Sequence, residues 1–302
     1  MSRIELLGLD GSNPLGFLAA LGLLRLVPAA KLGFSRETSS AFLDEFDGQA
    51  SDLAALVADD ASASAASRAA WRFTYTKAAT KKQGAREVAD LKPTPADFKQ
   101  FLATCVNSWL LGNEEAAAYA AAYGTDVAVD GKGNTKPTAF HFTAAQQTFL
   151  GTVEDIRASV TEKWVMTSLF EGYGAQHGSN LRWDPGAERS WALMASNPSG
   201  NGTLVDAPLE WLAFRGLPLL PSFPRATRII TTGVTRRGDE MTFTWPLWSL
   251  SASLHTVRSA LQLDWTGAAR EYAERGVFAI CRSRIRRTSQ GFGNFGPSLV
   301  TC

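Results

Sequence analysis

The chain has 302 residues, of which 45% are hydrophobic and 20% charged, and its net charge is +1. This length corresponds to one large domain or two ordinary ones with a sizeable core, and the composition is that of a globular protein. The small net charge excludes a polycation, so binding to an anionic partner depends on how the charges are distributed.

The amino-terminal segment predicts a strand followed by a buried helix. Residues 3–9 alternate weakly as a strand, and Asn13 and Pro14 are good residues for the cap and the first turn of a helix. The helix from Pro14 to Val27 is apolar nearly all round, so we expect it at the centre of the fold. Its glycines, Gly16 and Gly22, lower helix propensity and are tolerated only if another backbone packs closely there.

The same segment bears on localisation. Glu5 and Asp10 precede the first apolar run, which argues against a signal peptide. The run from Leu15 to Val27 is too short to cross a bilayer, so no membrane association is expected.

The three cysteines of the chain are few and far apart, which favours a reducing cytoplasm over a disulfide framework.

Residues 38–170 are predicted to be mainly helical. We expect a helical region over 38–60, a strand over Trp71–Thr76, and helices opening at Pro95, Glu114 and Thr161. The segment Lys77–Lys99, which follows the predicted strand, is interpreted either as a solvated connector or as a basic loop near nucleic acid.

A glycine-rich loop over Asp130–Lys136 is the first candidate site. Lys132, Asn134 and Lys136 lie on this loop, where glycines let a backbone approach a ligand closely. It is either a solvated surface turn or a loop that contacts a phosphate backbone. The spacing does not match a nucleotide P-loop. A short strand over Ala139–Phe142 follows, and then a helix that starts at Thr143 with a Thr143–Gln146 capping box.

After Glu171 the sequence becomes rich in Gly, Pro, Trp and Thr, and short strands replace long helices. The expected elements are a turn at Leu181–Pro185, a strand at Ser190–Ala195, a loop at Ser196–Gly202, a helix at Pro208–Arg215, a hairpin of Thr227–Thr232 with Glu240–Trp245 and its tip at Arg236–Asp239, helices at Leu254–Leu263 and Ala268–Arg275, and a strand at Val277–Ile285. The chain is therefore predicted to be α+β, with a helix-rich region over 1–170 and a strand-rich, basic region over 171–302; the alternative is that both regions form one continuous domain.

Catalytic motifs are scarce. The three histidines share no metal-ligand spacing, and no Gly-x-Ser-x-Gly elbow is present, so neither a metal nor a cofactor is expected. Asp90-Leu91-Lys92 is only superficially similar to an Asp-x-Lys nuclease core. His141 is interpreted either as an exposed strand histidine or as a lone catalytic or nucleic-acid-contacting group. Whether the chain is an enzyme therefore stays uncertain, and a binding protein is favoured.

The carboxy-terminal stretch gives the strongest positive signal. From Arg275 to the end there are five arginines and no acid. On a strand, Arg282, Arg284 and Arg286 project from one face at a spacing of about 6–7 Å, close to the phosphate repeat of an extended single strand. Guanidinium groups bind phosphate oxygens in pairs, and nearby aromatic rings can stack on bases. The predicted nucleic-acid contacts here are Arg282, Arg284, Arg286, Arg287, Phe292, Asn294 and Phe295. The alternative is an edge strand kept soluble by its charge.

Several blocks of the sequence resemble proteins of type I-G (formerly I-U) CRISPR–Cas systems. The resemblance spans nearly the whole chain. The blocks are Leu6–Arg25, Asp130–Asn134, His141–Gln147, Leu181–Asp184, Ala195–Ser199, Thr244–Trp248 and Arg282–Arg286. It implies a non-catalytic subunit or accessory of an RNA-guided DNA-targeting complex, similar to a small Cascade large subunit, although the chain is shorter than most large subunits.

The leading hypothesis is therefore a nucleic-acid-binding subunit of a type I CRISPR interference complex. Its partners would be CRISPR RNA and/or target DNA and other CRISPR-associated subunits. Two alternatives remain: a nuclease or other hydrolase without a recognisable metal motif, and a scaffold that contacts only proteins and uses its nine tryptophans at interfaces.

Overall fold

The computed structural model describes residues 3–77, 79, 84–143, 146–172, 174–187, 204–288 and 291–302. These residues form the mixed α+β fold that the sequence predicts. The helices are α1 (Pro14–Leu26), α2 (Ala50–Ser62), α3 (Ala65–Arg68), α4 (Pro95–Leu110), α5 (Glu114–Tyr123), α6 (Phe149–Ser159), α7 (Glu162–Met166), α8 (Ala207–Gly216) and α9 (Leu254–Ala260), with helical turns η1 (Thr167–Glu171), η2 (Pro185–Ala187), η5 (Leu217–Leu219) and η6 (Ala269–Arg275).

The strands pair in antiparallel fashion within two larger sheets and several hairpins. One sheet has the order β1 (Ile4–Asp10), β3 (Ser40–Asp44), β2 (Lys31–Phe34), β14 (Ala252–Ser253), and the other β12 (Val234–Arg237), β13 (Glu240–Trp248), β15 (Val277–Arg287), β16 (Gly293–Thr301). The two-stranded pairs are β4 (Tyr75–Lys77) with β5 (Arg86–Val88), β6 (Gly124–Val129) with β7 (Thr135–Pro137), β8 (Gln176–His177) with β9 (Leu204–Val205), and β10 (Ser222–Arg225) with β11 (Arg228–Thr231).

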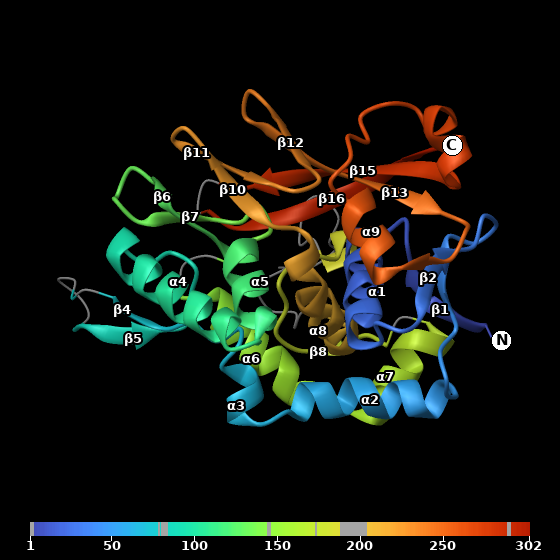
Figure 1. Cartoon of the computed structure of the whole chain (residues 1–302), viewed down its shortest axis with the longest axis horizontal. Coiled ribbons are helices and arrows are strands. Elements are labelled where there is room, and N and C mark those ends of the chain that lie inside the picture. Colours follow the sequence, from blue (N-terminus) through green and yellow to red (C-terminus); the bar gives the residue numbers. More distant parts are fainter. Residues whose placement is uncertain are drawn as a thin grey trace, which may run out of the picture.

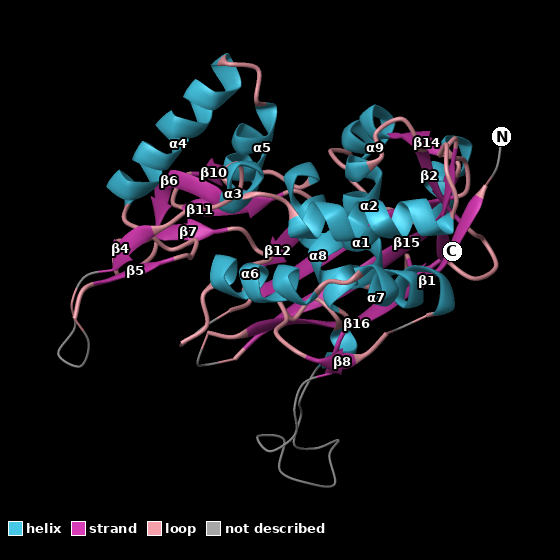
Figure 2. Cartoon of the chain, turned by 90° about the horizontal axis from the view of Figure 1, so that it is seen from below, coloured by secondary structure: helices cyan, strands magenta, loops and turns pink. Residues whose placement is uncertain are grey.

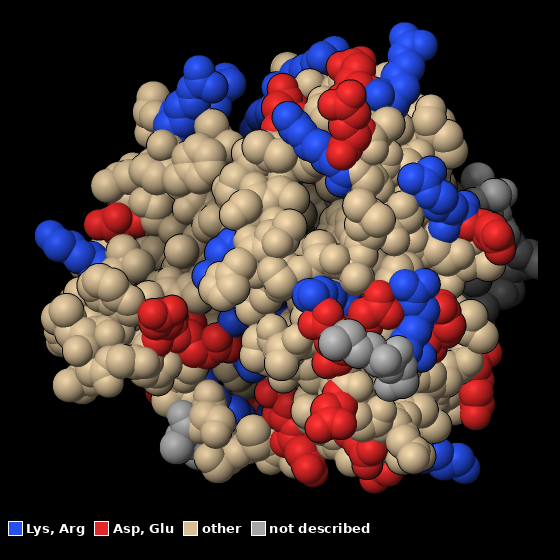
Figure 3. Space-filling view, turned by 45° about the vertical axis from the view of Figure 1, so that its right-hand side comes forward, with Lys and Arg blue, Asp and Glu red and all other residues tan. Residues whose placement is uncertain are grey.

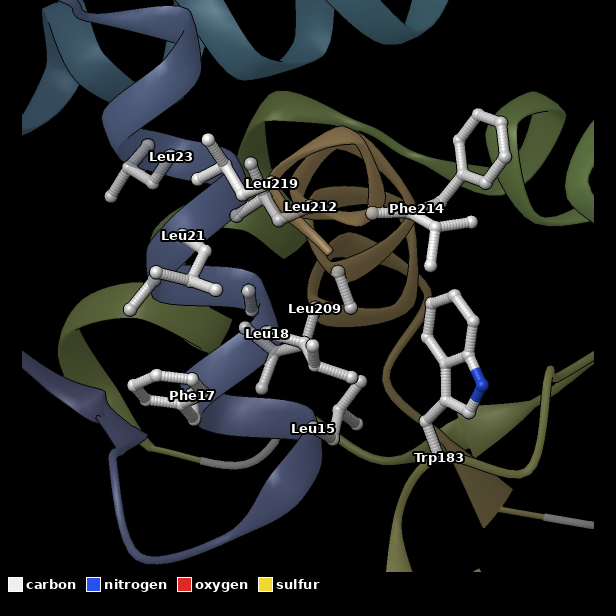
Figure 4. Packing of buried hydrophobic residues seen from close by; sticks show 14 of the residues in the cluster. Leu15, Phe17, Leu18, Leu21, Leu23, Trp183, Leu209, Leu212, Phe214 and Leu219 are labelled. Carbon is white, nitrogen blue, oxygen red and sulfur yellow. The ribbon is translucent and has the colours of Figure 1, made fainter. Parts of the chain in front are cut away.

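Helix α1 lies at the centre of the core, as its apolar sequence predicts. Asn13 caps it by accepting a hydrogen bond from the Leu15 N–H at 2.9 Å, and every residue from Pro14 to Leu24 is buried. The close approach expected at Gly22 is confirmed: a Cβ there would lie 1.7 Å from the Leu212 carbonyl oxygen on α8. Gly216 of α8 faces α1 in the same way, and leucines interlock on either side of this crossing (Figure 4).

The sheet β12–β13–β15–β16 lies above the pair α1 and α8, and α2 and α7 lie below that pair (Figures 1 and 2). Its inner face packs on α1 through aromatic rings, because Phe17 stacks on Trp245 at a centroid distance of 5.7 Å. One hydrophobic cluster runs from Leu6 to Phe295 and joins residues of both halves of the chain. The opposite face of the sheet is turned away from α1 and α8, and the segment between α9 and η6 covers part of it.

The helical prediction for residues 38–60 is wrong in its first part. Ser40–Asp44 forms strand β3, which pairs with both β1 and β2, and only Ala50–Ser62 is helical. The strand is favoured because it lies in the middle of the sheet, where its first four residues are buried. The predicted strand at Trp71–Thr76 shrinks to β4.

The segment after β7 also differs from the prediction. Residues 139–142 form no strand, and all four side chains are buried, so no face points to solvent. The helix begins at Phe149 with Thr148 at its N-cap, instead of at Thr143. The Thr143 hydroxyl lies 3.4 Å from His141 Nε2 and does not cap a helix.

Two hairpins replace the single hairpin predicted around residues 227–245. Strand β11 pairs with β10, while β13 pairs with β12 across the predicted tip at residues 236–239. Strand β15 is present as predicted, and it pairs with β16, which the sequence did not indicate. The predicted strand Ser190–Ala195 and loop Ser196–Gly202 lie outside the described residues. Among the residues described, no helix is long and apolar enough to cross a membrane.

Candidate nucleic-acid interface

The outer face of the sheet β12–β13–β15–β16 carries the predicted arginine ladder. Along β15, Cys281, Ser283 and Ile285 are buried, whereas Arg284 and Arg286 are exposed. The alternation expected for this strand is thus confirmed, because successive side chains of a strand point to opposite faces.

Arg282 lies on this outer face but has a structural role. Its guanidinium donates to the carbonyl oxygens of Thr266 and Gly267 at 2.9 and 2.8 Å, and to the Thr301 hydroxyl at 3.2 Å. These bonds hold the segment between α9 and η6 against the sheet. We therefore remove Arg282 from the predicted ladder of Arg282, Arg284 and Arg286, because its guanidinium already donates hydrogen bonds within the chain.

The open part of the outer face lies nearer the turn between β12 and β13. Register places Arg237 opposite Glu240, Thr242 opposite Arg284, and Arg286 opposite Asn294. Since paired residues of antiparallel strands share a face and side chains alternate along each strand, Arg237, Arg284 and Arg286 all point outward. We call these three residues the arginine face.

Two acidic side chains lie beside this surface, at the turn between β12 and β13. Asp239 pairs with Arg236 at 3.5 Å. Glu240 pairs with Arg284, and the two side chains are 60% and 61% exposed. Because exposed ion pairs contribute little to stability, about 0–1 kcal/mol, a phosphate group could displace Glu240 from the guanidinium.

Three hairpins, β6–β7, β10–β11 and β12–β13, lie next to one another along this side of the molecule (Figure 1), and basic residues stand at their tips. The tip between β6 and β7 presents Lys132, the tip between β10 and β11 is flanked by Arg225 and Arg228, and the third tip carries Arg236 and Arg237. The first two hairpins are joined by Lys136, whose Nζ donates to the Thr227 carbonyl oxygen at 2.8 Å.

The glycine-rich loop is a well-defined turn at the end of the β6–β7 hairpin. Asp130 Oδ1 accepts hydrogen bonds from the N–H groups of Lys132 at 2.8 Å and Asn134 at 3.1 Å, and Gly133 has a φ of 81°. The backbone of Asn134 is thus used within the turn. The exposed Lys132 side chain is the part of this loop that faces solvent.

Residues 222–248 and 277–288 together carry eight arginines, two acidic residues and no lysine. Arg225, Arg228 and Arg237 are not among the residues that the sequence predicts to bind nucleic acid. The sequence does contain a pattern that indicates a basic surface: arginines stand on both sides of the short turn Arg225-Ala-Thr-Arg228 and directly before Gly238. Its meaning depends on the hairpins lying side by side, which requires the fold.

The predicted aromatic stacking residues are placed differently. Phe295 is fully buried and packs on Phe142 at a centroid distance of 5.0 Å, so no base can reach it. Burial follows from strand β16, where this residue points into the core. Phe292 is half-buried, with the Arg182 guanidinium 4.4 Å from its ring centroid, and the Asn294 amide donates to the Phe295 carbonyl oxygen at 3.3 Å.

Arg287 and His141 form an internal connection, which corrects both predictions. The Arg287 guanidinium donates to the carbonyl oxygens of His141 and Ala139, each at 3.1 Å. The His141 side chain is only 1% exposed, so it is not an exposed strand histidine and has no access to a ligand. Arg287 therefore fastens residues 139–141 to the end of β15.

Asp90 completes this connection. Its Oδ1 atom lies 2.9 Å from His141 Nε2 and accepts from the Phe149 N–H at 3.1 Å. Burial would raise the pKa of Asp90, but the hydrogen bonds that its carboxylate accepts from His141 and from the Phe149 N–H outweigh burial, and the pKa is lowered. Burial lowers the pKa of His141, so its neutral form is favoured at neutral pH. Asp90 thus organises the start of α6.

Two further acids are buried beside α8, away from the arginine face. Asp206 caps the helix by accepting from the Leu209 N–H at 3.1 Å, and burial raises its pKa to about 6. Glu210 accepts from the Leu181 N–H at 3.2 Å, and burial raises its pKa to about 8. Within the described ranges, no group of three His, Cys, Asp or Glu side chains could hold a metal ion.

A cavity of about 520 Å³ lies between α9, β14 and β13, and its mainly apolar walls include Trp248 and Trp265. None of the predicted site residues lines it. On the face drawn in Figure 3, basic and acidic side chains gather in mixed clusters around a broad uncharged area. The arginine face and hairpin tips are thus the candidate site with the clearest chemical character.

Comparison with protein-family models gives no match for this chain, and comparison with curated proteins gives none either.

Proposed function

We propose that the chain is a non-catalytic, nucleic-acid-binding subunit or accessory of a type I CRISPR RNA-guided DNA interference complex. The arginine face and the hairpin tips contact the phosphate backbone of the guide RNA or the target DNA. The observation that carries the proposal is the outward-facing set of Arg237, Arg284 and Arg286 on adjoining strands. Arg225, Arg228 and Arg236 lie at the neighbouring hairpin tips, and residues 222–248 and 277–288 contain only two acids, Asp239 and Glu240.

The chemistry of this surface suits phosphate. Arg284 and Arg286 are two residues apart on one strand, a spacing of about 6–7 Å, and Arg237 lies on a strand two positions across the sheet at about 5 Å per strand. Guanidinium groups at such spacings bind successive phosphates with paired hydrogen bonds. Such contacts fix position without reading sequence, as expected for a subunit whose specificity comes from base pairing with a guide.

The proposed complex rests on the sequence resemblance given above. In this proposal the chain acts in the cytoplasm, and its partners are CRISPR RNA and/or target DNA and other CRISPR-associated subunits. No cofactor is required, because phosphate contacts of this kind need only the side chains of the protein.

The test is direct binding of the purified chain to labelled single-stranded RNA, single-stranded DNA and duplex DNA, measured by fluorescence anisotropy. We expect the Arg237→Ala, Arg284→Ala, Arg286→Ala triple variant to bind at least about tenfold more weakly, with similar losses for unrelated sequences.

The matched control is the Arg258→Ala, Arg270→Ala, Arg275→Ala triple variant, which removes the same charge from exposed positions on α9 and η6. It should bind like the wild type. Equal losses in both triples would show a non-specific charge effect and would reject the arginine face as the binding surface.

A further inference from the structure

Helix α4 has an exposed face without charge. Between Gln100 and Asn113 the chain has no Lys, Arg, Asp or Glu. Near the end of the helix, Val106 is 49% exposed, Trp109 52%, Leu110 69% and Leu111 88%. Surface helices normally carry charged or polar residues on their outer side, so this face lacks the usual features of a solvent-exposed helix.

The way α4 is attached leaves this face uncovered. Of its residues only Phe98 and Cys105 are buried, and Cys105 belongs to a small separate cluster with alanines of α5. Figure 2 shows α4 at the edge of the molecule with α5 on its inner side. Among the tryptophans that the structure describes, Trp109 alone is more than a tenth exposed. An exposed group of large apolar side chains marks a protein interface.

The exposed stripe of α4 has a positive charge at one end and a negative charge at the other. Lys99, Ala103, Val106 and Leu110 are all exposed and follow one another at helical spacings of four, three and four residues, so they lie on one side of the helix. Lys99 stands at the first end of the stripe. Exposed Glu114 stands just beyond the other end, at the start of α5.

We propose that this face binds the same face of a second copy of the chain, with the two α4 helices antiparallel about a two-fold axis. In that arrangement Lys99 of one copy lies opposite Glu114 of the other, twice per dimer, while the uncharged Ala103–Leu110 stripes pack at the centre. The face is complementary to itself in charge, which is the condition for an isologous dimer, the commonest kind of oligomer. This proposal is independent of the nucleic-acid function.

The test is the mass of the full chain by light scattering after size-exclusion chromatography, over a range of protein concentrations. We expect a concentration-dependent dimer in the wild type and a monomer for Leu110→Asp. Leu250→Asp is the matched control, because Leu250 is 67% exposed at a different site, and this variant should still dimerise. A wild type that is monomeric at every concentration, or a Leu110→Asp variant that still dimerises, would overturn the proposal.

Charge reversal distinguishes the antiparallel dimer from any other association. Lys99→Glu and Glu114→Lys should each raise the dimer dissociation constant by about tenfold or more, because each puts like charges opposite one another twice. An equimolar mixture of the two variants should regain dimers, since both pairs become attractive again in the mixed dimer. Failure of the mixture to dimerise would reject the arrangement, even if either variant were less stable.

Discussion

The replacement Gly22→Ala tests the packing of α1 against α8, on which the rest of the fold is built. The new Cβ atom would lie 1.7 Å from the Leu212 carbonyl oxygen and 2.9 Å from the Gly216 nitrogen, whereas ordinary contact begins near 3.4 Å. Both obstacles are backbone atoms of a buried helix, so the two helices must move apart. Overpacking in a core costs about 1–3 kcal/mol, and a backbone obstacle places the cost at the upper end.

Alanine also favours the helix by about 1 kcal/mol over glycine, so we expect a net loss of about 2 kcal/mol in the free energy of unfolding. Urea denaturation, followed by both far-UV circular dichroism and tryptophan fluorescence, measures it. Gly131→Ala is the control, because a Cβ atom at this position would have no other atom within 4 Å, and its effect should stay within about 0.5 kcal/mol. The sign of the change in unfolding free energy is the decisive result. A Gly22→Ala variant more stable than the wild type would show that helix propensity dominates and that the helices do not pack this closely.

Three further predictions concern the buried Glu210, the aromatic pair Phe292 and Phe295, and Arg282. Burial raises the pKa of Glu210 to about 8 from 4.5, so between these pH values the folded chain keeps a proton that the unfolded chain loses. The free energy of unfolding should therefore fall by up to about 1.4 kcal/mol per pH unit as the pH rises from 4.5 to about 8. Glu210→Gln should flatten this pH dependence, and an unchanged slope in the variant would contradict the burial of an ionisable group at this position. Phe295→Ala should cost about 3–5 kcal/mol in the same urea assay, as for a core aromatic residue, and Phe292→Ala clearly less; similar costs would argue against the placement of β16. Arg282→Ala should speed amide hydrogen exchange around Thr266 and Gly267 without weakening nucleic-acid binding, and reduced binding would restore this arginine to the interface.

The parts of the fold that the sequence predicts well are those with strong local signals. Helix α1 has an Asn–Pro start and an apolar sequence on every side, and β15 alternates between arginines and small or apolar residues. The start of α4 at Pro95 and the position of α8 at residues 207–216, close to the predicted Pro208–Arg215, follow from similar local chemistry. In each case the residues that define the element lie within one or two turns of one another.

Other parts depend on contacts that are distant in the sequence. Ser40–Asp44 becomes a strand because it is placed between β1 and β2, and a short apolar run does not distinguish a strand from a helix by itself. His141 is buried because Asp90 and the Arg287 guanidinium meet it there. Arg282 and Arg284 look equivalent on one strand, but the segment after α9 covers only Arg282.

The salt dependence of nucleic-acid affinity tests the central claim most directly. Each phosphate contact releases bound counterions, so the slope of log affinity against log salt should be about −0.7 per contact for a single strand. The Arg237→Ala, Arg284→Ala, Arg286→Ala triple variant should therefore flatten the slope by about 2 units, whereas the Arg258→Ala, Arg270→Ala, Arg275→Ala triple should leave it as in the wild type. An unchanged slope in the first variant, or the same change in both, would contradict the assignment of the arginine face as the phosphate-binding surface.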